Sequence, residues 1–93
     1  MSCKYLVMSN GEHGCEYAVV FGETESHVVI AHRLGGTDKV LGAGMVSIGT
    51  GIEGQHMVSC YGESITLKKK SRGSEDAFFV VMALFGSTGD VDY

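Results

Sequence analysis

Most of the chain's positive charge is gathered in one short segment, which carries four of its seven basic residues: Lys68, Lys69, Lys70 and Arg72. The segment lies between a strand-like run at 57–62 and an expected helix start at 74–76. Fixed positive charge at such a junction can hold a phosphate or a carboxylate, and the backbone N–H groups of Gly73 and Ser74 would add donors. The cluster therefore predicts an anion-binding turn. A solvated turn, neutralised by the acids that follow at once, is the alternative.

Among the histidines, His27 is the best candidate for acid–base chemistry, because it would lie in the first turn of a helix. A helix N-terminus disfavours the protonated ring, so a neutral base is favoured there. A capping or surface histidine is the alternative. His27 and His32 lack the i, i+4 spacing of a metal pair, and His13, Cys15 and Cys3 include no C-x-x-C spacing. We expect no metal and no cofactor.

The composition is that of one small domain covering residues 1–93. The net charge of −4 disfavours binding to duplex nucleic acid, which needs a basic face. No apolar run approaches the roughly 20 residues that cross a bilayer, and the start of the chain lacks the order of a secretion signal. The three cysteines form an odd set without disulfide spacing, which indicates reduced thiols. We therefore expect a cytoplasmic protein that binds no membrane.

Four segments read as strands: 5–8, 17–21, 40–48 and 56–62, the last with an extension at 64–67. Asn10-Gly11 marks a turn between the first two strands, which suggests an antiparallel pair. The stretch Gly42-Ala43-Gly44 lacks the third glycine and the strand-to-helix context of a dinucleotide fingerprint, so close strand packing is its favoured meaning.

Residues 26–34 are open to two interpretations. As a helix, the segment would place on one face His27, Ile30, Ala31 and Leu34. The Ser26 cap and the Gly-Gly stop that follows Leu34 favour this helix. The β-branched run 28–30 favours a strand instead.

A last helix is expected from Ser74, as its N-cap, to a stop at Gly86. The predicted class is therefore α+β: a single domain with a mainly antiparallel sheet of four to five strands, two helices and the order β-β-α-β-β-α. A sheet with both helices on one face is the economical solution for this order.

Four pieces, taken in order, resemble the Janus/phosphohistidine phosphatase family. These are Lys4–Val7 on the first strand, Ser26–Ile30 at the first helix, Leu41–Gly44 and His56–Ser64. The family is similar in having a lysine on its first strand, a histidine at its first helix, a Leu-Gly-Gly-Gly stretch and a Tyr-Gly-Tyr-Ser stretch. Its members are small cytoplasmic α/β proteins without metal that remove phosphate from protein histidine.

The resemblance implies roles for three residues here. His27 would be the general base, and Lys4 and Ser64 would hold the phosphate. Three features depart from the family pattern. Met45 stands where an arginine is usual, and residues 65–68 replace the small residues that follow the family's serine. The chain is also shorter than the family norm, mainly between the first strand and the histidine.

Two functional hypotheses follow, and the sequence does not decide whether the protein is an enzyme. The first is a phosphate-handling protein that acts on a phosphoprotein through His27, Lys4, Ser64 and the basic cluster Lys68, Lys69, Lys70 and Arg72. The second is a non-catalytic module that self-associates as a dimer or other homo-oligomer through the apolar segment Phe78–Val81, or binds an acidic partner through residues 68–72.

Overall fold

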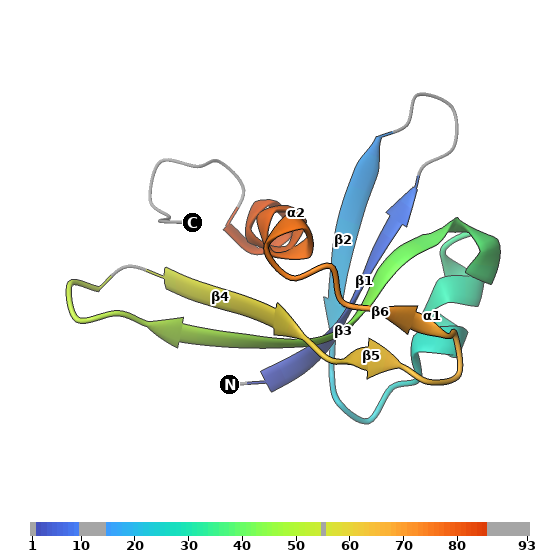
Figure 1. The fold of residues 1–93 in the computed structure, drawn as a ribbon, viewed down its shortest axis with the longest axis horizontal. Helices are drawn as coiled ribbons and strands as arrows, with labels where there is room; N and C mark the ends of the chain where they lie inside the picture. The colour runs from blue at the N-terminus through green and yellow to red at the C-terminus, as the bar shows by residue number, and fades with distance from the viewer. Residues whose placement is uncertain (1, 10–14, 55, 86–93) are drawn as a thin grey trace.

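The fold is a four-stranded antiparallel sheet with a helix packed on each face (Figure 1). This computed structural model describes residues 2–9, 15–54 and 56–85. The sheet runs in the order β2-β1-β3-β4 and is made of β1 (Ser2–Ser9), β2 (Glu16–Phe21), β3 (Val40–Thr50) and β4 (His56–Tyr61). A separate ribbon pairs β5 (Glu63–Ser64) with β6 (Lys69–Lys70). The helices are α1 (His27–Arg33), α2 (Ser74–Phe85) and the short 3-10 helix η1 (Thr37–Lys39).

The predicted α+β class is confirmed, and the predicted element order matches apart from the added η1 and β5–β6 ribbon. In the described part of the chain, neither helix has the length and apolarity needed to traverse a bilayer.

β1 is the central structural strand, because both of its faces are covered. Tyr5 and Val7 belong to a core shared with Val80 of α2, while Leu6 and Met8 belong to a core shared with α1. All four β1 side chains are fully buried. Successive strand residues point to opposite faces, so a continuous apolar run is what two covered faces require. The expectation that both helices share one face was therefore wrong.

Residues 27–33 form a helix, which decides between the two interpretations of this segment. The predicted apolar face is confirmed: Ala31 is fully buried, and Ile30 and Leu34 pack against the same core. The helix ends where Gly36 adopts a φ of 124° and donates its N–H to the Ala31 carbonyl at 2.9 Å. A glycine in this left-handed region is a common helix stop.

The segment after β4 differs from the expected long strand. β4 ends at Tyr61, and Gly62, with a φ of 79°, turns the chain into the β5–β6 ribbon. Within the ribbon, Glu63 pairs with Lys70 and Ser64 with Lys69. Lys68 forms the turn with a φ of 56°. The basic cluster therefore begins in a tight hairpin rather than in a strand-to-helix loop.

A buried carboxylate, Asp76, joins α2 to the sheet. Its Oδ2 accepts hydrogen bonds from the Tyr5 hydroxyl at 2.5 Å and from the Arg72 backbone N–H at 2.8 Å. Its Oδ1 accepts from Arg72 Nε at 2.7 Å. The Arg72 guanidinium also reaches Glu16 of β2, with Nη2 at 2.7 Å from Oε1. Burial and the neighbouring carboxylate raise the pKa of Tyr5, so this phenol stays a neutral donor.

The same carboxylate explains how α2 begins. The Gly73 carbonyl accepts the first helical bond, from Ala77 N–H at 3.0 Å, so Gly73 is the N-cap and Ser74 is the first helical residue. The prediction of Ser74 as N-cap was wrong. Asp76 accepts from the Arg72 N–H and Ser71 Oγ accepts from the Gly73 N–H at 3.1 Å, so these side chains satisfy the two backbone donors just before the helix.

Gly42 and Gly44 of β3 serve close packing, as the sequence indicated. A Cβ on Gly42 would overlap the Asp76 carboxylate, and a Cβ on Gly44 would overlap the Tyr61 carbonyl oxygen. Any side chain at either position would displace a polar group that the fold holds in place.

We expect Asp76→Ala to lower the free energy of unfolding by about 3 kcal/mol, because it removes the buried carboxylate that accepts from both Tyr5 and Arg72. The Tyr5 hydroxyl would keep only Ser71 Oγ, and the Arg72 guanidinium would lose its buried counter-charge. Urea denaturation measures this change. Glu75→Ala is the matched control: Glu75 is 72% exposed and lies 3.8 Å from Arg72, so its loss costs less than about 1 kcal/mol. Equal effects of the two substitutions would contradict the role assigned to Asp76.

Candidate functional site

A hollow of about 340 Å³ lies between the sheet and the β5–β6 ribbon, beside the start of α1. Its lining includes Lys4 of β1, His27 of α1 and Ser64 of β5, together with Met45 of β3. The structure thus brings together the three residues that the sequence resemblance singled out, from segments far apart in the chain.

His27 is a buried group of this hollow, with 7% of its surface exposed. Its Nε2 lies 3.0 Å from the Gly44 carbonyl oxygen. A carbonyl only accepts hydrogen bonds, so Nε2 carries the proton and the lone pair of the neutral ring is on Nδ1. The Phe21 ring meets the imidazole edge to face, with ring centroids 5.4 Å apart, and this contact restricts its tilt.

The surroundings of His27 favour its neutral form. Burial lowers the pKa of His27, and the nearby Lys4 charge lowers it further, against the opposing effect of the Gly44 hydrogen bond. The ring is therefore an unprotonated base at neutral pH, as its proposed role requires.

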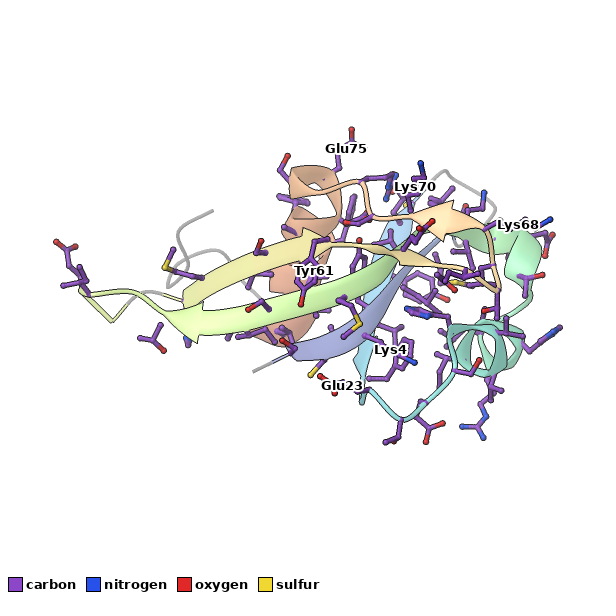
Figure 2. The ribbon with its side chains drawn as sticks, turned by 60° about the horizontal axis from the view of Figure 1, so that its bottom comes forward. Lys4, Glu23, Tyr61, Lys68, Lys70 and Glu75 are labelled. Carbon is purple, nitrogen blue, oxygen red and sulfur yellow. The ribbon has the colours of Figure 1, made fainter. Side chains whose placement is uncertain are left out.

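Lys4 is fixed at the edge of the hollow. Its Nζ donates a hydrogen bond to the Glu25 carbonyl oxygen at 2.8 Å, which ties β1 to the loop before α1. An ammonium group has three protons, so this bond leaves two for a ligand. Figure 2 shows Lys4 on the face of the sheet that carries the hollow.

Ser64 lies at the end of β5 with 2% of its surface exposed. Its Oγ is 3.4 Å from both Thr66 Oγ1 and Leu67 N, so the hydroxyl also holds the ribbon turn. These contacts are long for hydrogen bonds of this kind, and the hydroxyl can reorient toward a ligand.

The basic cluster does not join this hollow. Arg72 is held by Asp76 and Glu16 on the other side of the sheet. Lys69 and Lys70 are exposed and, as neighbours on a strand, point to opposite faces. Figure 2 shows Lys68 and Lys70 separated from each other and from Lys4. The four side chains that the sequence grouped as one anion-binding turn therefore do not converge.

Sequence reasoning missed three contributors to the site. The Gly44 carbonyl orients His27, although the glycine was interpreted only as a packing residue. Glu25 and Glu63 line the hollow and bring two carboxylates to it. Glu25 and Glu63 lie within two residues of the predicted site residues His27 and Ser64, and this adjacency was the signal that could have identified them. Gly44 is 17 residues from His27, so no local signal marked its carbonyl as a partner.

Comparison of the chain with family models, curated proteins and solved structures found no match. In the part of the chain that the structure describes, no three His, Cys, Asp or Glu side chains are placed to share a metal ion. His13 lies outside the described residues, and Cys15 is exposed. Cys60 is a buried residue of the sheet, where burial raises the pKa of its thiol to about 12.

We expect His27 to make stability fall as the pH drops below 6.5. The unfolded chain protonates this ring near its ordinary pKa of 6.5, whereas the folded chain, with a lowered pKa, takes up the proton only at lower pH. The loss therefore begins near pH 6.5 and is complete below the folded-state pKa. Urea unfolding between pH 5 and pH 8 measures it.

The difference between the wild type and His27→Asn isolates this contribution from other titrating groups. His32→Asn is the control, because His32 is exposed on the same helix. Should His27→Asn keep the pH slope of the wild type in this range, the assignment of a buried neutral His27 is refuted.

Proposed function

We propose that the hollow binds a phosphoryl group and that the protein hydrolyses phosphate from a phosphorylated protein side chain, with His27 as general base. The supporting observation is that Lys4, His27 and Ser64 line one cavity. The resemblance to the Janus/phosphohistidine phosphatase family assigns these three positions to phosphate binding and base catalysis. The proposed substrate is therefore a phosphohistidine-type side chain.

Each side chain has a separate task in this proposal. The Lys4 ammonium and the Ser64 hydroxyl donate hydrogen bonds to phosphoryl oxygens, where negative charge develops. Nδ1 of His27 accepts a proton from a water molecule as that water attacks phosphorus. The P–N bond breaks as the P–O bond forms, and the leaving nitrogen takes up a proton from solvent, which restores the neutral substrate side chain. His27 then releases the proton it accepted to solvent.

The charges around the hollow set the expected strength of binding. Met45 supplies no charge where the family usually has arginine, so Lys4 is the cation among the lining residues. The carboxylates of Glu25 and Glu63, which also line the hollow, repel a bound anion. These charges favour weak phosphate binding, in the millimolar range, over tight binding.

We expect inorganic phosphate to shift the His27 ring resonances saturably in NMR titrations at millimolar concentration. The hydrolysis rate of a phosphohistidine peptide should fall at least about 100-fold in His27→Asn, the loss expected when a general base is removed. Lys4→Met should weaken phosphate binding, because it removes the fixed cation.

His32→Asn is the matched control for both measurements and should behave as the wild type. The proposal fails if millimolar phosphate leaves the His27 resonances in place. It also fails as an enzymatic proposal if His27→Asn hydrolyses the peptide as fast as the wild type.

A second candidate function, self-association, is favoured by the outer face of α2. Phe78 and Met82 are 46% and 43% exposed, one helical turn apart. Phe78 and Met82 thus form an apolar ridge along α2. Apolar grooves of about 460 Å³ and 310 Å³ flank this ridge on its β4 and β2 sides. A ridge between two grooves can pack against its own copy, and exposed aromatic side chains are typical of interfaces. Val80 and Val81, predicted for this surface, are buried instead.

We expect the wild type to form a dimer at high micromolar concentration in static light scattering, and Phe78→Ser to shift it toward monomer because the ridge loses its aromatic side chain. Val29→Ser is the control, since Val29 is 43% exposed on α1, on the other side of the sheet. A wild type that stays monomeric at millimolar concentration would remove this candidate.

A further inference from the structure

The hollow continues into a row of side chains across the sheet. Lys4 of β1 is paired with Met45 of β3, and Met45 is paired with Tyr61 of β4. Residues paired across antiparallel strands share a face, with Cβ atoms about 5 Å apart. Lys4 and Met45 line the hollow, so Tyr61 is the next side chain outward on the same surface.

Tyr61 is available for contact, because 45% of its surface is exposed. Figure 2 shows it on the same side of the sheet as Lys4, at the end of β4 that leads into the β5–β6 ribbon. α2 covers the opposite face, where Val46 and Cys60 belong to its core. The row therefore borders the hollow as an open apolar surface.

The backbone of Tyr61 is held tightly against β3. Gly44 lacks a side chain where the Tyr61 carbonyl oxygen approaches, and Gly62 turns the chain sharply afterwards. The next two residues, Glu63 and Ser64, form a wall of the hollow. The aromatic ring and the phosphoryl-binding wall thus belong to one short segment whose geometry is fixed by two glycines.

These features specify what lies beside a bound phosphoryl group. A thioether and an aromatic ring offer a flat, polarisable, uncharged surface, which suits a planar ring better than an alkyl group. The carboxylates of Glu25 and Glu63 repel a second anionic group on the same ligand.

We propose that Met45 and Tyr61 form a subsite for an aromatic ring that carries a single phosphoryl group. This subsite rests on the proposed function, since it presumes a phosphoryl group in the hollow. The ligand class is a ring-borne monophosphoryl compound, as opposed to an alkyl phosphate or a polyphosphate. Tyr61 acts here as a specificity residue and takes no part in proton transfer.

Phenylphosphonate, methylphosphonate and inorganic phosphate, none of which needs to be hydrolysed, separate the subsite from the hollow itself. Their dissociation constants can be measured from the His27 ring resonances by NMR titration. We expect phenylphosphonate to bind about tenfold more tightly than methylphosphonate, the size of one good aromatic contact. Tyr61→Ser should abolish this preference and leave methylphosphonate binding unchanged, whereas Tyr61→Phe should retain it.

Phe78→Ser is the matched control, because Phe78 is equally exposed but lies on α2. Equal binding of the two phosphonates by the wild type, or a preference that survives in Tyr61→Ser, overturns the subsite and leaves the proposed function standing. If none of the three compounds, phosphate included, moves the His27 resonances, the proposed function itself fails and the subsite falls with it.

Discussion

The buried carboxylate of Asp76 is the interaction on which the arrangement of the other elements depends. It receives the Tyr5 hydroxyl from the central strand, and the backbone N–H and guanidinium of Arg72 from the segment after β6. Arg72 then extends to Glu16 on the edge strand β2. A buried charge is tolerated only when it is paired and fully hydrogen-bonded, so the three segments and α2 must take one mutual position.

This constraint reaches the candidate site through the chain on either side. Tyr5 enters the network on one face of β1, while its neighbour Lys4 faces the hollow on the other. Arg72 closes the segment that returns from the β5–β6 ribbon, and this ribbon carries Ser64. The rigid network and the hollow therefore share two short stretches of chain and lie on opposite sides of the sheet.

The sequence predicted those parts of the fold that depend on local pattern. The apolar spacing of residues 27–34 and the glycines that follow favoured a helix over a strand and indicated its buried face. The continuous apolar run at 5–8 also indicated that both faces of its strand are covered. The alternation of side chains along a strand does not, however, say which helix lies on which face. The β5–β6 ribbon was missed because its two-residue strands are too short to show any period.

The candidate site was only partly predictable for a similar reason. Lys4, His27 and Ser64 could be named one by one from a family resemblance, but their meeting depends on β1 lying beside β3, which is a matter of sheet order. Arg72 was grouped with its lysine neighbours by proximity in sequence. Its charge is instead satisfied by Asp76, which sequence alone placed in an ordinary first turn, and by Glu16, 56 residues away. Long-range pairing of this kind leaves no mark on local composition.

The close approach of Gly42 to the Asp76 carboxylate also limits how this chain can diverge. No side chain fits at position 42 while the carboxylate stays where it is, and moving that carboxylate releases both Tyr5 and Arg72. A descendant of this chain that acquired alanine at position 42 would need a compensating change at position 76. Two sites in separate secondary structures, one on a strand and one on a helix, would then be inherited as a linked pair.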